Sequence, residues 1–195
     1  MLSAVPPSLT PVLASLAATS PPESRPGDAL LVGRLEAAER LGHQPGRLAA
    51  LYGLASEALA RCEARLPEVL RTDGPADVRA AAAHLLSGGG KRIRPLLLVL
   101  SARACQPAGA PPLPPGPLCA LMVAAELVHT ATLLHDDVLD VSEVRRGQET
   151  ARMRWGNSVS VLAGDFVLTR ALEEVLGSGI AGAMPAVLQT RSEEH

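Results

Sequence analysis

The sequence predicts an all-α protein, and three observations support this fold class. Apolar residues recur at helical spacing from about residue 47 to residue 176, and residues 118–140 form an apolar segment without glycine or proline. Strand signals are scarce, because Tyr52, Trp155 and Phe166 are the only aromatic residues and alternating β-branched runs are nearly absent. With 195 residues, 47% of them hydrophobic, the chain has enough apolar mass for one core.

The individual helices follow from apolar periodicity and from the glycines and prolines that bound it. Residues 107–117 carry six prolines and are expected to form a loop. Residues 1–45 are rich in Pro, Ser and Ala and predict a largely disordered lead-in, with one short helix near Leu30–Leu41. A single helical domain is therefore expected over 46–195, with helices at 47–70, 74–89, 94–106, 118–140 and 158–176.

Charge and cysteine content exclude several classes of protein. A net charge of -2 provides no basic field for nucleic acid, so an anion site has to be local. The three cysteines show neither CxxC spacing nor a nearby histidine pair, which argues against a disulfide framework and against a zinc site. We expect them to be small buried apolar residues in a reducing compartment. The N-terminus lacks a basic leader and its apolar stretch contains prolines, so we expect no membrane span and a cytoplasmic location.

The segment LLHDDVLD places three carboxylates near the end of the longest predicted helix. Asp136 and Asp140 are one turn apart, with Cβ atoms about 5 to 6 Å from each other on one face. Two like charges at this distance need a cation, and paired oxygen ligands suit Mg²⁺. The alternative is a solvated acidic helix end, but the leucines and valines around the acids favour a cleft.

Basic residues gather at two further places. Lys91, the only lysine in the chain, and Arg94 follow three glycines, so they project to one side of a helix start where the backbone can approach a ligand; Arg92 is expected to face solvent. Arg145 and Arg146 precede a glycine and are expected to diverge on a turn toward phosphate oxygens.

A histidine lies on the same helix as the acids. His129 is two turns before Asp136, where its imidazole could donate to an anion; the alternative is a satisfied core histidine.

Taken together, the segments GGGKRIRP, ELVHTATLLHDDVLD, VRRGQET and WGNSVSVLAGDFVLTRAL resemble the all-trans polyprenyl diphosphate synthases over roughly residues 50–176. The resemblance implies a partial isoprenoid-synthase helical bundle and condensation of an allylic diphosphate with isopentenyl diphosphate. A homodimer or heterodimer is expected.

The same resemblance implies the role of each site residue. Asp136 and Asp140, with Asp137 nearby, would hold Mg²⁺ against the allylic diphosphate, which Arg145 would also contact. Isopentenyl diphosphate would be bound by Lys91, Arg94, His129 and Arg146. Asp136, Asp140 and Lys91 are the residues expected to be catalytic.

The family carries a second aspartate-rich motif, which this sequence lacks before it ends at His195. We therefore expect the N-terminal half of a synthase, with the C-terminal half absent and activity impaired when the chain is alone. Two alternatives remain open. The chain could be a non-catalytic partner subunit of a full-length synthase, or an HD-type metal phosphohydrolase that uses His135 and Asp136 with His84 or His129.

Overall fold

A computed structural model of the chain describes residues 45–192, and the side chains of residues 49–189. The predicted lead-in and the short helix near Leu30–Leu41 lie outside the described residues. The chain divides into two units, residues 1–54 and 55–195, and the side-chain contacts and the site discussed below lie in the second.

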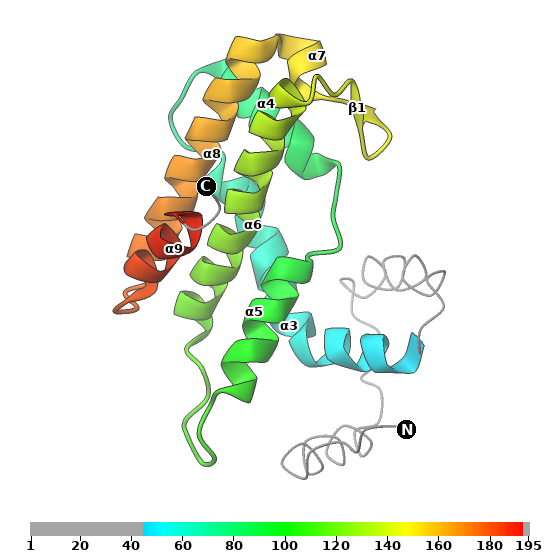
Figure 1. Cartoon of the computed structure of the whole chain (residues 1–195). Coiled ribbons are helices and arrows are strands. Elements are labelled where there is room, and N and C mark those ends of the chain that lie inside the picture. The colour runs from blue at the N-terminus through cyan, green and yellow to red at the C-terminus, as the bar shows by residue number, and fades with distance from the viewer. Residues whose placement is uncertain (1–44, 193–195) are drawn as a thin grey trace. The chain divides into compact units, whose positions relative to one another are not determined.

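The described part is helical, as predicted (Figure 1). Each of the five predicted helices is present, and the departures from all-α structure are two strands of two residues each. The elements are α3 (Pro45–Val69), α4 (Ala76–Ser87), α5 (Ile93–Ala104), α6 (Pro115–Leu139), β1 (Val144–Arg145), β2 (Gln148–Glu149), α7 (Ala151–Trp155), α8 (Asn157–Gly177) and α9 (Ala183–Ser192).

The loop expected over residues 107–117 is shorter than predicted, because α6 begins at Pro115. Proline fixes φ near the helical value, and its missing N–H is no loss in the first turn, where amides have no partner within the helix. The prolines at 115 and 117 therefore start the helix rather than prevent it, and Pro114 is its N-cap.

The pair α6 and α8 forms the centre of the bundle, and the two helices run side by side in opposite directions (Figure 1). The buried face of α8 is mostly small, which allows the helix axes to approach closely; its buried residues are Ser160, Ala163, Gly164, Val167, Ala171, Glu174 and Val175. The Ser160 hydroxyl donates a hydrogen bond of 3.0 Å to the Leu134 carbonyl across this interface. Close approach of the two helices is therefore a property of their sequence.

Gly164 has a specific role at this interface. A Cβ atom on Gly164 would lie 2.3 Å from Nε2 of His135, so the imidazole occupies the space that a side chain would need. His135 Nε2 also lies 3.2 Å from the Val161 carbonyl oxygen and 3.3 Å from Asp165 Oδ1. The sequence showed only that this glycine was tolerated within a helix, whereas the structure shows what requires it.

By length and composition α6 is the one helix in the described part that could cross a membrane, and 44% of its most apolar window is buried inside the structure. Its packing against α5 and α8 accounts for its apolar character as a core helix. The absence of a membrane span and the cytoplasmic location stay predictions.

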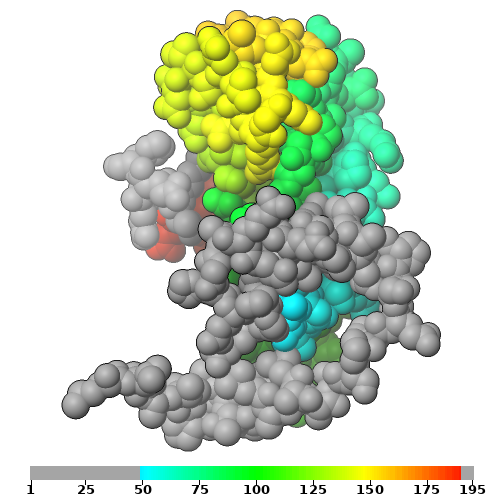
Figure 2. Space-filling view, turned by 90° about the vertical axis from the view of Figure 1, so that its right-hand side faces the viewer, coloured from blue at the N-terminus to red at the C-terminus, as the bar shows by residue number. Residues whose placement is uncertain are grey.

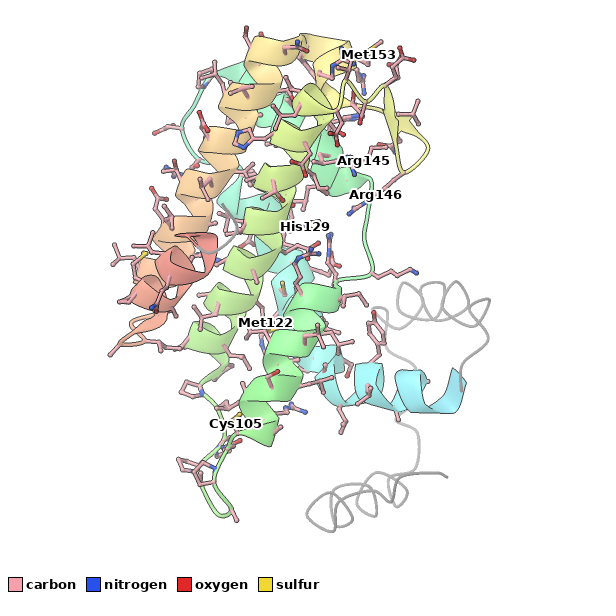
Figure 3. The ribbon with its side chains drawn as sticks, viewed as in Figure 1. Cys105, Met122, His129, Arg145, Arg146 and Met153 are labelled. Atoms are coloured by element: carbon pink, nitrogen blue, oxygen red, sulfur yellow. The ribbon has the colours of Figure 1, made fainter. Side chains whose placement is uncertain are left out.

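The expectation of three buried cysteines was correct only in part. Cys62 is buried and Cys119 is partly buried, but Cys105 is exposed at the end of α5 (Figure 3). Burial raises the pKa of the Cys62 thiol, so this group remains protonated at neutral pH.

We expect Gly164→Ala to lower the free energy of unfolding by about 1–3 kcal/mol, because the new methyl group overlaps the His135 ring. Gly177→Ala in the same helix is the matched control. No heavy atom lies within 4 Å of a Cβ placed there, so it should be neutral or slightly stabilising. Urea unfolding measures both variants. Adding His135→Ala to Gly164→Ala should restore part of the loss, and equal stability of the two glycine variants would contradict the packing argument.

Candidate functional site

The last turn of α6 presents two carboxylates on one face. The Asp140 amide donates to the Asp136 carbonyl over 2.8 Å, and Asp140 keeps helical dihedral angles (φ -82°, ψ 0°), so the two side chains stay one turn apart as predicted. Asp136 is half-buried and Asp140 is exposed.

Two carboxylates one turn apart fit part of the shell of a Mg²⁺ ion, which keeps water molecules and shares its other positions with phosphate oxygens. Within residues 45–192, no group of three or more His, Cys, Asp or Glu side chains could hold a metal ion. Asp136 and Asp140 would therefore need oxygen atoms from water or from a ligand to complete the coordination.

Asp137 lies on a different face of α6 and is fully buried. Its Oδ1 accepts a hydrogen bond of 2.7 Å from Nε of Arg145, while Oδ2 is buried without a hydrogen-bond partner among the described residues. The carboxylate thus holds Arg145 in place. A direct contact between Asp137 and a metal stays a prediction.

The chain reverses sharply after α6 and returns over the acidic end of the helix. Val141 adopts a left-handed conformation (φ 54°), and the Ser142 amide donates to the Asp137 carbonyl over 3.0 Å, which is the hydrogen bond of a Schellman motif. The Thr150 hydroxyl and Nη1 of Arg152 both donate to the Ser142 carbonyl. This reversal carries β1 back toward Asp137.

The hairpin β1–β2 directs two adjacent arginines to different places. The turn residues Arg146 and Gly147 both have positive φ values (53° and 77°), the pattern of a type I′ turn. Arg145 points to Asp137, whereas Nη1 of Arg146 lies 3.2 Å from the position that a Cβ on Gly90 would take. The two arginines diverge at the turn, and their approach to phosphate oxygens stays a prediction.

The glycine-rich segment allows a close approach, as predicted, but the groups that approach it are protein side chains. Around the missing Cβ of Gly90 lie Nη1 of Arg92 at 3.1 Å, Nη1 of Arg146 at 3.2 Å and Oε1 of Glu126 at 3.5 Å. A side chain at this position would displace the guanidinium groups. The neighbouring Gly89 is favoured for a different reason, because its backbone has a positive φ of 71°.

The expectation that Arg92 faces solvent was wrong. Arg92 is only 5% exposed, and it hydrogen bonds to Glu63 of α3 (2.7 and 3.2 Å) and to Glu126 of α6 (2.7 Å). Its left-handed backbone (φ 49°) at the N-cap of α5 differs from the helical turn assumed for this segment. Burial acts to lower the pKa of Arg92, but the two carboxylates raise it overall, so the guanidinium remains charged.

One signal in the sequence could have revealed this network. Glu126 is the only Asp, Glu, Lys or Arg between positions 118 and 135, in the middle of an apolar helix. A carboxylate there is buried at a large cost unless a cation pairs with it.

The hairpin arginines Arg145 and Arg146 lie on the same side of α6 as His129 (Figure 3). Burial lowers the pKa of the half-buried His129, and the charges of Arg94, Arg146 and Arg145 lower it further, while Glu126 opposes them. Burial also lowers the pKa of Arg146, and Arg92, Arg145 and Arg94 add to this effect. The structure therefore brings Arg94, His129, Arg145 and Arg146 into one electrostatic cluster, hereafter the cationic cluster.

Lys91 is exposed on the loop that leads from Gly90 to α5, next to the buried Arg92. Figure 2 shows that the yellow segment around the hairpin forms a continuous surface with green atoms of earlier helices. The roles assigned to Lys91 and the other site residues remain predictions.

The histidines needed by a phosphohydrolase do not gather around Asp136. His135 packs on α8 against Gly164, and His84 on α4 bonds to the Glu149 carbonyl and to Arg154. The described residues thus lack the metal cluster that this alternative requires.

The family of the chain follows from comparison with known proteins. Residues 75–194 match the model of the family described as Polyprenyl synthetase, which is more than half of the chain. The chain belongs to the polyprenyl synthetase family. The resemblance identified from the four sequence segments is therefore confirmed, as is the helical fold.

Members of the polyprenyl synthetase family resemble this chain over part of their length. It is 47% identical over 96 residues to octaprenyl diphosphate synthase of Escherichia coli, covering 49% of this chain and 28% of that protein. It is 36% identical to heptaprenyl diphosphate synthase component 2 of Geobacillus stearothermophilus, covering 74% and 43%. The chain thus spans less than half the length of these two curated relatives.

A solved structure supports the same assignment. Polyprenyl synthase from Caulobacter crescentus, complexed with calcium and isoprenyl diphosphate, superposes with a TM-score of 0.64 at 39% identity, covering 71% of this chain and 40% of that one.

We expect Arg92→Met to lower the free energy of unfolding by about 3–5 kcal/mol, because the carboxylate of Glu126 would be left buried without its partner. Arg61→Met is the control, since Arg61 pairs with the largely exposed Glu57 and should cost about 1 kcal/mol or less. Chemical denaturation measures both. Adding Glu126→Gln to Arg92→Met should recover part of the loss; similar costs for the two arginine variants would refute the network.

The lowered pKa of His129 predicts a pH dependence of stability. Because the folded protein binds this proton more weakly than the unfolded chain, the free energy of unfolding should fall as the pH drops below about 6.5. His129→Gln should make this fall smaller between about pH 7.5 and pH 5.5. Urea unfolding at both pH values measures the effect, and identical pH dependence in the two proteins would contradict it.

Proposed function

We propose that the chain carries the diphosphate-binding part of a prenyltransferase that condenses an allylic diphosphate with isopentenyl diphosphate. The observation that carries this proposal is the position of Arg145. Asp137 at the acidic end of α6 accepts a hydrogen bond from Nε of Arg145. The positive charge of Arg145 in turn acts on both His129 and Arg146. Asp137 lies in the same turn of α6 as Asp136 and Asp140, so the proposed Mg²⁺ ligands and the cationic cluster would serve neighbouring diphosphate groups at this end of the helix.

The carboxylate pair would bind the allylic diphosphate through metal. Asp136 and Asp140 would supply two oxygen ligands, and bound Mg²⁺ would neutralise negative charge on the departing diphosphate. Arg145 would donate from its terminal nitrogens to the same group, since Asp137 already occupies its Nε.

The cationic cluster would bind the diphosphate of isopentenyl diphosphate. Lys91, Arg94 and Arg146 would donate to phosphate oxygens, and His129 would contribute its N–H. The arginines of the cluster repel one another when it is empty, so an anion with several charges relieves this repulsion as it binds. Holding the second substrate beside the first supplies proximity for attack on the allylic carbon.

A second candidate is a partner subunit of another synthase, because one relative is named as component 2 of a heptaprenyl diphosphate synthase. In this case the chain would bind diphosphate and a second chain, and product would form only when the two are mixed. A homodimer or heterodimer is proposed for either function.

The test is a Mg²⁺-dependent incorporation assay with radiolabelled isopentenyl diphosphate and a farnesyl or geranylgeranyl primer. The assay is run with the chain alone and with a full-length relative, with pyrophosphate binding measured by calorimetry in parallel. Incorporation by the chain alone supports the enzyme, and incorporation above that of the relative alone supports the subunit. No incorporation in either mixture, together with no binding of pyrophosphate, would refute both functions.

We expect Asp136→Asn to weaken Mg²⁺-dependent pyrophosphate binding, and any turnover, by about a hundredfold, as loss of a metal ligand removes several kcal/mol. Asp77→Asn, at an exposed position in the first turn of α4, is the control and should leave both unchanged. Equal binding by the Asp136 variant and the wild type would refute the metal assignment.

A further inference from the structure

His84, in the last turn of α4, uses both nitrogen atoms of its ring. Nε2 lies 2.8 Å from the carbonyl oxygen of Glu149 in β2, and Nδ1 lies 3.1 Å from Nη1 of Arg154 in α7. A guanidinium only donates, so Nδ1 must be the acceptor. Nε2 then donates to the Glu149 carbonyl.

Trp155 completes this contact. Its ring packs edge-on against His84, with centroids 5.3 Å apart and an angle of 62°, and Arg154 Cζ lies 5.0 Å from the centre of the Trp155 ring. Each of the three side chains therefore touches the other two, in contacts that combine hydrogen bonding, aromatic packing and cation–π attraction. We refer to His84, Arg154 and Trp155 as the His84 clamp.

The clamp joins the two segments that carry the site cations. The glycine loop that leads to Lys91 begins directly after α4, and the hairpin β1–β2 carries Arg145 and Arg146. Within the described part of the chain, both side-chain hydrogen bonds between α4 and residues 144–155 are made by His84. A small surface pocket marks the junction, lined among others by His84, Gly88, Arg145, Arg146 and Gln148.

The hairpin needs such an anchor for two reasons. Each strand has only two residues, and isolated two-stranded hairpins are marginal in water even when they are longer. In addition, Arg92 and Arg94 repel Arg146 whereas Glu126 attracts it, so charge alone does not fix Arg146 relative to the glycine loop. The ion pair of Arg145 with Asp137 ties β1 to α6, and His84 adds the attachment to α4.

We propose that His84 is a positioning residue for diphosphate binding, which fixes the hairpin arginines relative to the glycine loop. This inference rests on the proposed function, because it assumes that the cations bind a diphosphate. His84 itself touches backbone and side chains of the protein and acts through Arg145 and Arg146.

Two substitutions and one control test the proposal in the full chain. His84→Leu keeps a similar side-chain volume but removes both hydrogen bonds, whereas His84→Gln retains one acceptor and one N–H donor. Ser87→Ala is the control, because it removes a hydrogen bond within α4, to the His84 carbonyl, that does not reach the hairpin. The measurements are the affinity for Mg²⁺-pyrophosphate by calorimetry and amide hydrogen exchange of the ligand-free protein.

We expect His84→Leu to weaken pyrophosphate binding by about tenfold or more, and His84→Gln by less than about threefold. Exchange should increase in residues 144–155 of His84→Leu while α6 and α8 keep their protection, which separates positioning from a general loss of stability. Ser87→Ala should change neither measurement.

The proposal is overturned if His84→Leu exchanges like the wild type in residues 144–155, or if it loses protection equally throughout the bundle. It is also overturned if Gln weakens binding as much as Leu does. If the wild type itself does not bind pyrophosphate, the proposed function fails, and hydrogen exchange alone still decides whether His84 holds the hairpin.

Discussion

The buried ion pairs of Arg92 are the interaction on which the arrangement of the site depends. This one guanidinium connects Glu63 of α3, the start of α5 and Glu126 of α6, and it does so from a left-handed backbone conformation that directs it inward. Because the side chain points inward, its neighbours Lys91 and Arg94 remain at the surface. A buried charge network of this kind is costly to assemble, but it leaves few alternative positions for the loop that it holds.

The same network sets the charge balance of the site. Glu126 pairs with Arg92 and opposes the effect of the surrounding positive charges on Arg146 and His129. At the end of α6, Asp137 restrains Arg145 by accepting a hydrogen bond from its Nε, so the terminal nitrogens of Arg145 could donate to a ligand. Ion pairs within the protein thus fix the directions of Arg92 and Arg145, while the positive charge of the cationic cluster favours a polyanionic ligand.

Helix positions could be predicted from the sequence because apolar spacing and the glycines and prolines at helix ends are local signals. The start of α6 at Pro115 was missed, since a proline looks the same whether it interrupts a helix or begins one. Arg92 was misjudged because its direction depends on one backbone dihedral angle and on carboxylates 29 and 34 residues away. The contacts of His84 with Glu149 and Arg154 depend on tertiary structure in the same way and leave no local pattern. The family could be identified from sequence because several segments could be considered together as one pattern, whereas the roles of the site residues stay predictions.

The contact between His135 and Gly164 also constrains how this sequence can change over evolutionary time. One ring and one missing side chain share a single volume between α6 and α8. A larger residue at position 164 requires a smaller one at position 135, or a wider helix pair. Related chains that keep the same helix spacing should therefore show correlated residue choices at these two positions, although the imidazole and the glycine are far apart in the sequence.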